Sequence, residues 1–157
     1  FFFSSRRRHT RSAACASVST ASPLIGLLAG MVAGLARMLA PGGLLSLLVR
    51  NGDALAMRPG IGGDWTAALA SFDTTAYTNR LGLDVRADRL ATLTATLAGI
   101  GAPLHAWYGV RVFTDTAADG APVPPDVETL LAAEERAGRT DPYRQVAALL
   151  HLCGVRG

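Results

Sequence analysis

The side chains that most often do chemistry are few in this chain, and their spacing excludes several common sites. His9, His105 and His151 have no second histidine four residues away, so the helical pair typical of zinc sites is absent. Ser46 does not lie in a Gly-x-Ser-x-Gly elbow. We therefore predict no metal centre and assign no catalytic residue. His151, which lies between two leucines, is expected to be a hydrogen-bonded core residue.

The positions of the cysteines and carboxylates exclude further kinds of functional site. Cys15 and Cys153 lie at opposite ends of the chain, which excludes a disulfide scaffold and a CxxC redox motif. No Asp or Glu precedes Asp53, so the first third of the chain has no carboxylate for a ribose, a metal or a proton. Glu134 and Glu135 are adjacent and are expected to form a solvated helix face. Any acid chemistry must therefore lie in the later part of the chain.

Composition predicts one folded domain of ordinary size without a basic surface. The chain has 157 residues, of which 50% are hydrophobic and 17% charged. Four of its 15 basic residues lie within the first 11 positions, which leaves 11 arginines against 12 carboxylates in the rest. All basic residues are arginine, which we attribute to a GC-rich genome. A nucleic-acid partner is therefore not indicated by net charge, and a basic patch requires local clustering.

The first residues are interpreted separately from the domain. Residues 1–12 have no apolar period and are expected to be a disordered or non-biological tail, with the domain in residues 13–157. The alternative is a signal or membrane anchor in the segment Arg6–Leu39, where a basic start precedes an uncharged stretch. Against this alternative, the strongly apolar part is short for a membrane span and Arg37 interrupts it. We therefore favour a helix buried against a sheet.

The apolar pattern predicts an alternation of helices and strands. A helix is expected from Pro23 to Leu39, followed by a Pro-Gly-Gly turn and a strand over Leu44–Val49 that is buried on both faces. The segment Arg50–Leu83 is predicted to be a long irregular connection with a helical turn or two around 66–72. Later elements are a helix opened by Asp88, a strand over Leu104–Thr114, a helix from Pro125 to before Gly138, a short helix from Asp141, and a strand over Ala148–Val155.

Three segments carry a resemblance to a known family. They are LARMLAPGGLLSLLVRNG, WYGVRVFTD and LLAAEERAGRTDPYRQVAALLHL. Together they resemble the C-terminal half of class I S-adenosylmethionine-dependent methyltransferases, and are most similar to the group that methylates 5-carboxymethoxyuridine at the tRNA wobble position. The Pro-Gly-Gly turn occurs across the superfamily, whereas Gly-Val-Arg-Val-Phe followed by Asp-Pro-Tyr is more selective. The resemblance covers residues 23–156.

The resemblance implies a fold and a cofactor. The fold is α/β, the C-terminal part of a Rossmann-like methyltransferase sheet with flanking helices, in which the last strand lies between the other two. The cofactor is S-adenosylmethionine, but the glycine-rich loop and the acidic residue that hold it in the family belong upstream of Pro23, where this sequence has no match. A fourth-strand region is expected at about 15–21. The chain is thus interpreted as a fragment that neither binds the cofactor tightly nor turns over alone.

The acceptor site is expected where ligands bind open α/β sheets, beyond the carboxyl ends of the strands. Arg50 and Asn51 follow the 44–49 strand, and the sequence Tyr77-Thr78-Asn79-Arg80 ends the long connection. A carboxylate acceptor, which the resemblance implies, needs no general base and only cationic or hydrogen-bonding groups to orient it. We name Asn51, Arg80, Tyr108 and Arg111 as candidate substrate-binding residues. The acceptor is either tRNA or a small molecule, and the expected compartment is the cytoplasm.

Arg111 has two interpretations. Strand alternation places it on the same face as Trp107 and Phe113, both of which are expected to be buried, so its charge requires a partner. That partner is either the acceptor or a carboxylate of the later helical segment. The carboxylates considered are Asp141, Glu134 and Glu135. We favour the structural ion pair.

Overall fold

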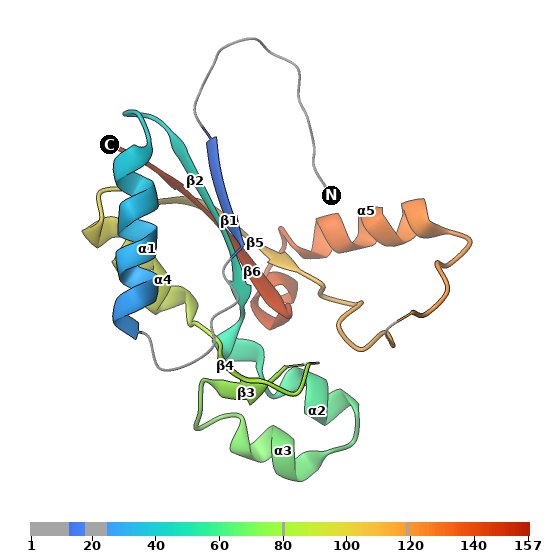
Figure 1. Cartoon of the computed structure of the whole chain (residues 1–157). Coiled ribbons are helices and arrows are strands. Elements are labelled where there is room, and N and C mark those ends of the chain that lie inside the picture. Colours follow the sequence, from blue (N-terminus) through green and yellow to red (C-terminus); the bar gives the residue numbers. More distant parts are fainter. Residues whose placement is uncertain (1–12, 18–24, 80, 119) are drawn as a thin grey trace.

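The computed structural model describes residues 13–17, 25–79, 81–118 and 120–157, and its centre is a four-stranded sheet (Figure 1). The strands are β1 (Ala13–Ser17), β2 (Leu44–Arg50), β5 (Leu104–Val110) and β6 (Leu149–Val155). They follow the spatial order β1-β2-β6-β5. β1 runs parallel to β2, and β6 runs antiparallel to both of its neighbours. The last strand therefore lies between the other two, as expected.

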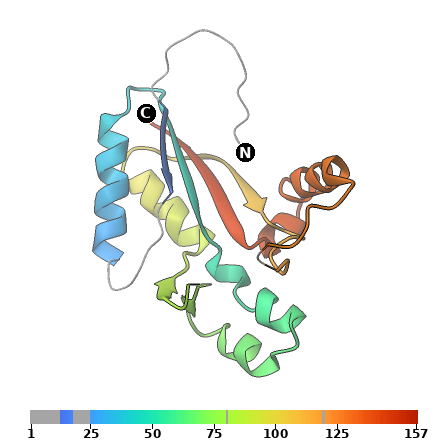
Figure 2. The same cartoon turned by 45° about the vertical axis from the view of Figure 1, so that its right-hand side comes forward.

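Two helices cover one face of this sheet. The helices α1 (Ile25–Met38) and α4 (Leu90–Gly99) lie on the same side of it, and the turned view in Figure 2 shows the same arrangement. Their buried side chains pack against the inner face of β2 and β6. This core contains Val32, Ala36, Leu45, Leu47, Val49, Leu93, Leu97, Leu150 and Leu152. The buried apolar residues that recur along both helices and along β2 therefore face one hydrophobic core.

The strand β2 differs from its prediction in one respect. Its side chains alternate between the core and the outer face, because the two helices cover only one side. Leu45 is fully buried, whereas Leu44 and Leu48 are 40% and 38% exposed. The uninterrupted apolar run indicated a strand buried on both faces, and that prediction is wrong for the outer one.

The long connection forms a small lobe at the end of the sheet where β2 finishes (Figure 1). It contains a 3-10 turn (Gly52–Ala54), α2 (Met57–Ile61), α3 (Trp65–Ala70) and the hairpin strands β3 (Ala76–Thr78) and β4 (Asp84–Arg86). The predicted helical turns near 66–72 correspond to α3. The hairpin was not predicted, because each of its strands is only three residues long.

The remaining elements agree with their predicted positions within a few residues. α5 (Val127–Ala137) lies apart from α1 and α4, near the end of β5 (Figure 2). A 3-10 turn (Tyr143–Val146) then leads into β6. Among the described residues no helix combines the length and the apolarity needed to cross a membrane. The predicted tail, the part of the fourth-strand region after Ser17, and Pro23 lie outside the described residues.

Candidate functional site: an arginine-lined pocket at the end of β2

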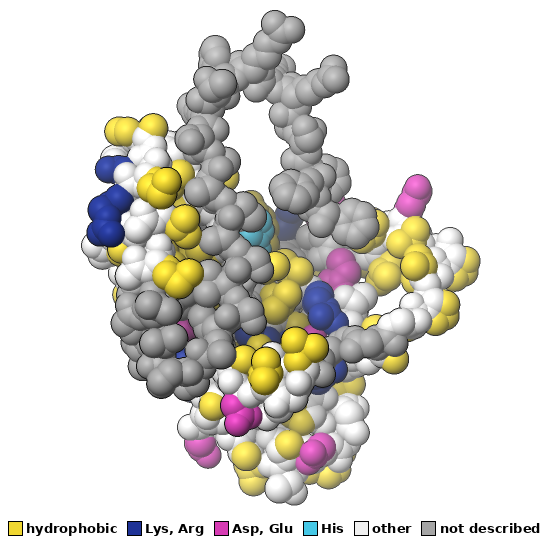
Figure 3. Space-filling view, viewed as in Figure 1, with side chains coloured by type: hydrophobic (Ala, Val, Ile, Leu, Met, Phe, Trp, Pro, Cys, Tyr) yellow, Lys and Arg dark blue, Asp and Glu magenta, His cyan; other side chains and the backbone are white. Residues whose placement is uncertain are grey.

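A pocket of about 620 Å³ lies where β2 enters the lobe. It has contributions from the end of β2, from α2, α3 and β3, and from the loop after β5. Figure 3 shows arginine side chains gathered on this side of the molecule, between the sheet and the lobe. The lining residues are Arg50, Leu55, Arg58, Pro59, Ala67, Ala70, Ser71, Thr74, Ala76, Tyr77, Thr78, Asn79, Arg111, Asp115 and Leu149. The pocket is therefore at the carboxyl end of a sheet strand, where the sequence predicted the acceptor site.

An ion-pair cluster forms one wall of the pocket. The Arg50 guanidinium donates from Nη1 to both carboxylate oxygens of Asp115, each at 3.2 Å, and from Nη2 to Oδ2 at 3.3 Å. Nη2 of Arg111 lies 3.7 Å from Oδ1 of the same carboxylate. The side chains of Arg50 and Asp115 are 12% and 13% exposed. Water therefore screens this contact less than it screens a surface ion pair.

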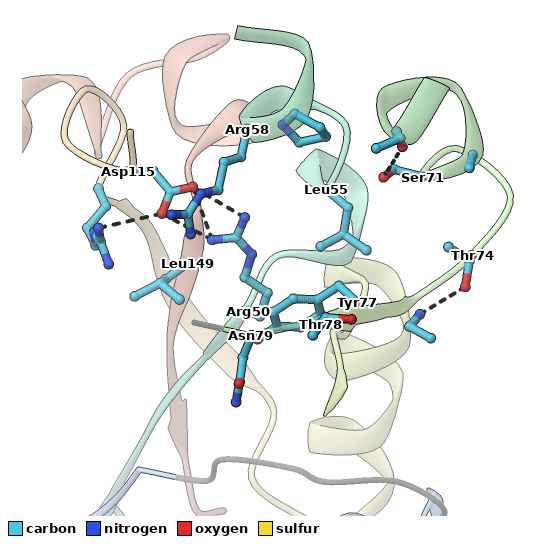
Figure 4. Close-up of a pocket in the computed structure, with 15 residues that line it drawn as sticks. Arg50, Leu55, Arg58, Ser71, Thr74, Tyr77, Thr78, Asn79, Asp115 and Leu149 are labelled. Carbon is cyan, nitrogen blue, oxygen red and sulfur yellow. Dashed lines mark hydrogen bonds and ion pairs between the residues drawn. The ribbon is translucent and has the colours of Figure 1, made fainter. Parts of the chain in front are cut away.

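A third arginine points into the same cluster from α2. Figure 4 shows the head group of Arg58 beside those of Arg50 and Asp115. Arg58 has no hydrogen bond or ion pair to another side chain in the described part of the chain. The described lining thus carries three arginines against one aspartate. This excess of positive charge favours an anionic ligand.

Tyr77 lines the pocket beside Arg50, together with Thr78 and Asn79 (Figure 4). The Arg50 guanidinium lies over its ring, with Cζ 5.5 Å from the ring centroid. Burial raises the pKa of the Tyr77 hydroxyl; the nearby Arg50 charge acts in the opposite direction, and Asp115 adds to the rise. Tyr77 is therefore a neutral phenol at neutral pH and a hydrogen-bond donor beside the cationic groups.

The loop that carries Arg111 is shaped by Glu134 of α5. The Glu134 carboxylate accepts hydrogen bonds from the backbone N–H groups of Val112, Phe113 and Thr114 at 2.8, 3.0 and 3.0 Å, and from the Thr114 hydroxyl at 2.8 Å. Arg111 itself has φ of 61°, in the left-handed region. β5 therefore ends at Val110, and its predicted continuation to Thr114 is wrong. Glu134 binds a loop and is not part of a solvated face.

The structural interpretation of Arg111 holds, with a different partner. Its guanidinium pairs with Asp115 and donates to the Thr114 carbonyl at 3.3 Å. Asp115 was not among the three carboxylates considered; in a strand running through this segment the side chains of Arg111 and Asp115 would share a face but lie about 13 Å apart. Phe113, expected to be buried, is 53% exposed because the chain leaves the sheet before reaching it. Arg111 nevertheless lines the pocket, so it remains available to a ligand.

Asn51 is buried beside the pocket, and its amide is already used. The side chain is 1% exposed, and Nδ2 donates to the carbonyls of Gln145 and Ala147 at 3.0 and 2.9 Å. Its Oδ1 accepts from the backbone N–H of Asp53 at 3.0 Å. Both donor hydrogens of the amide are therefore occupied. In this structure Asn51 connects the end of β2 to the segment that enters β6.

Of the two remaining predicted residues, Tyr108 does not line the pocket, and Arg80 is not among the residues that the structure describes. Tyr108 lies on β5 next to His151, with ring centroids 5.9 Å apart, and the Arg139 guanidinium lies 5.8 Å from its ring centroid. It is not part of the pocket lining. Arg80 lies outside the described residues, although its neighbour Asn79 lines the pocket. The predicted substrate-binding roles of these residues stay predictions.

His151 is hydrogen-bonded, as the sequence predicted, but it is half-buried on the outer face of β6 and is not a core residue. Its Nε2 lies 2.8 Å from the Ser46 hydroxyl and 3.7 Å from the Cys153 thiol. Burial lowers the pKa of His151 and raises the pKa of the Cys153 thiol. Both groups are therefore neutral at neutral pH, and neither is activated for nucleophilic chemistry.

Arg58 and Asp115 are the site residues that sequence reasoning missed. Arg58 lies in the connection that the sequence left without defined elements, and Asp115 follows a turn that is created by a distant glutamate. The available signal was weak: the motif WYGVRVFTD contains both Arg111 and Asp115, four residues apart. That spacing produces an ion pair here only because the chain turns after Val110.

The lining does not fit S-adenosylmethionine. The cofactor carries a sulfonium group, an ammonium group and one carboxylate, so its net charge is positive and three arginines would repel it. The carboxylate in the described lining, Asp115, is paired with Arg50 and Arg111. The pocket therefore suits an anion and not this cofactor.

No protein-family model matches the chain, and no curated protein sequence matches it. An S-adenosylmethionine dependent methyltransferase from Mesorhizobium loti has a similar crystal structure, with a TM-score of 0.46 and 14% sequence identity. The similarity covers 92% of this chain and 61% of that one, so the chain spans less than two thirds of the solved protein's length. The α/β fold class rests on the sheet and the helices of this chain itself.

Proposed function

We propose that this chain is the C-terminal part of an S-adenosylmethionine-dependent methyltransferase that binds a carboxylate-bearing acceptor in the arginine-lined pocket. The observation that carries the proposal is the excess of arginine over carboxylate in the pocket lining. Guanidinium groups bind carboxylates through parallel charge-assisted hydrogen bonds, which fix orientation as well as charge. Orientation is what an acceptor that is already nucleophilic requires from its protein.

The motifs and the sheet support the methyltransferase part of the proposal. The Pro-Gly-Gly turn precedes β2, and the selective Gly-Val-Arg-Val-Phe motif covers the end of β5 and the turn after it. The last strand, β6, lies between β2 and β5, which is the arrangement that the sequence resemblance implied. We propose that S-adenosylmethionine is held by a part of the polypeptide upstream of Pro23, since the described pocket does not suit it.

The proposed acceptor is 5-carboxymethoxyuridine, in tRNA or as the free nucleoside. In this assignment Arg58 and Arg50 bind the carboxylate, and Arg111 adds positive charge behind them. Tyr77 offers a ring face and a neutral hydroxyl to the rest of the ligand. A tRNA acceptor places the protein in the cytoplasm. Its phosphates would need further cationic groups, because the arginines and carboxylates beyond the first 11 residues nearly balance.

The carboxylate part of the proposal is tested by calorimetric titration. The 157-residue chain is titrated with 5-carboxymethoxyuridine and with 5-methoxyuridine, which lacks the carboxylate. Arg58→Gln removes one charge from the pocket, and Arg136→Gln removes one from an exposed position on α5 as a matched control. We expect the first nucleoside to bind about tenfold tighter, a difference that Arg58→Gln abolishes and Arg136→Gln leaves intact. Equal affinities for the two nucleosides would overturn the proposal.

The methyltransferase part is tested separately. The reading frame is extended upstream of codon 23, and the longer polypeptide is assayed for transfer of a labelled methyl group from S-adenosylmethionine to the nucleoside or to tRNA that carries it. We expect labelled ester with the longer polypeptide and none with the 157-residue chain. An upstream frame without a strand, a glycine-rich loop and an acidic residue about 20 positions later would contradict the assignment.

A further inference from the structure

The carboxylate of Asp115 occupies the position in the pocket that an anionic ligand would take. It is held by three close contacts from the two terminal nitrogens of Arg50 and lies near Arg111 on its other side. This arrangement has the same donors and the same acceptor chemistry as an arginine-bound ligand carboxylate. Figure 4 shows the contact within the pocket wall, next to the head group of Arg58. An incoming acid group therefore meets arginines that already have an internal partner.

The four hydrogen bonds from the loop to Glu134 do not involve the Asp115 carboxylate. Glu134 anchors the preceding residues, and its last contacts are with the backbone N–H and the hydroxyl of Thr114. Asp115 follows this anchor, and the next three residues are exposed and have no regular secondary structure. Displacing the Asp115 side chain therefore leaves the four hydrogen bonds to Glu134 in place.

We propose that Asp115 is a specificity-determining residue that competes with the acid group of the ligand for Arg50 and Arg111. The proposal rests on the proposed function, in which the pocket binds a carboxylate. A small anion such as acetate contacts only the arginines. The free energy of these contacts does not compensate for the contacts that Asp115 loses when it is displaced. A larger ligand also contacts Tyr77 and the lobe, and it meets Arg58, which has no internal partner among the described residues. Asp115 thus restricts the pocket to ligands that fill it.

The opposite role for Asp115 makes the opposite prediction. If the carboxylate only orients Arg50 and Arg111 for the ligand, its removal leaves two loose arginine side chains and weakens anion binding. If it competes, its removal releases two cationic groups and strengthens anion binding. The sign of the change in affinity therefore separates the two roles.

The test uses Asp115→Asn, with Asp126→Asn as a control that removes one negative charge from the same connection outside the pocket. Each is titrated calorimetrically with inorganic phosphate, acetate and 5-carboxymethoxyuridine. We expect Asp115→Asn to bind phosphate and acetate about tenfold tighter than the wild-type chain, and to bind the nucleoside with a smaller gain. Asp126→Asn is expected to bind all three like wild type. Unchanged or weaker binding of phosphate and acetate to Asp115→Asn would overturn the proposal.

Two precautions keep this result interpretable. Thermal unfolding followed by circular dichroism establishes that each variant is folded, and Asp115→Ser replaces Asp115→Asn if the asparagine variant is not. The outcome is also separable from that of the proposed function. If the wild-type chain fails to discriminate the two nucleosides but Asp115→Asn still gains affinity for phosphate, the assigned acceptor is wrong and the competition is right. If the wild-type chain discriminates and Asp115→Asn gains nothing, the competition is wrong.

Discussion

Replacing Glu134 with alanine removes the anchor of the loop that carries Arg111 and Asp115. The carboxylate accepts four hydrogen bonds, at 2.8 to 3.0 Å, from three backbone N–H groups and one hydroxyl. Hydrogen bonds to a charged acceptor contribute about 1.5–3 kcal/mol each when they are buried. The N–H of Phe113 is exposed and the other donors are half-buried, so water replaces part of the loss.

We therefore expect Glu134→Ala to lower the free energy of unfolding by about 2–4 kcal/mol. For a chain of this length this corresponds to a fall in Tm of about 5–12 °C. Glu134→Gln retains one acceptor oxygen but directs an amide donor at the backbone donors, so its cost is expected to be intermediate.

The assay is thermal and urea unfolding, combined with hydrogen exchange of the backbone amides at 112–114. Glu135→Ala is a matched control, because it removes the same charge from the adjacent position. Within the described part of the chain, the side chain of Glu135 forms an exposed ion pair with Arg139 and no other, with side chains 54% and 62% exposed, so its loss is expected to cost less than about 1 kcal/mol. Equal stabilities of the two alanine variants, or unchanged exchange at 112–114 in Glu134→Ala, would refute the assignment of Glu134 as the loop anchor.

Three further predictions concern stability. Asn51→Ala leaves the Gln145 and Ala147 carbonyls without their partner and is expected to lower the unfolding free energy by about 2–4 kcal/mol, measured by urea unfolding. Gly109→Ala places a Cβ 2.7 Å from the Arg144 carbonyl and is expected to cost about 1–3 kcal/mol, whereas Gly99→Ala in α4 meets nothing within 4 Å and is expected to be neutral or stabilising. Burial lowers the pKa of His151 in the folded chain. As the pH falls below about 6.5, His151 therefore binds a proton in the unfolded chain before it does so in the folded chain, and the unfolding free energy decreases. Replacing His151 with Gln should reduce this slope; an unchanged slope would contradict the argument.

The elements that sequence reasoning predicted are those whose signals are local. The apolar period and the Pro-Gly-Gly turn place α1 and β2, and the charged first turn places α5. The end of β5 was missed because Val110, Val112 and Phe113 favour a strand. Instead, the N–H groups of Val112, Phe113 and Thr114 donate to the Glu134 carboxylate, about 20 residues later. This tertiary contact overrides a local preference.

The sequence predicted where the site lies, but not all of the residues that form it. The rule that ligands bind beyond the carboxyl ends of strands located Arg50 and Tyr77 correctly in one pocket. Arg58 and Asp115 were missed, because their positions depend on how the lobe folds back and on the turn after Val110. Asn51 was predicted to bind substrate because it follows β2. It does follow β2, but its buried amide donates to the segment before β6.

We propose that the arginine-lined pocket binds the carboxylate of the acceptor. This claim is tested most directly by a crystal structure of the chain with 5-carboxymethoxyuridine. We predict that the carboxylate lies within about 3.2 Å of guanidinium nitrogens of Arg58 and Arg50, with the uracil ring beside Tyr77. A nucleoside bound at another place, or one bound in the pocket with its carboxylate directed away from the arginines, would contradict the claim.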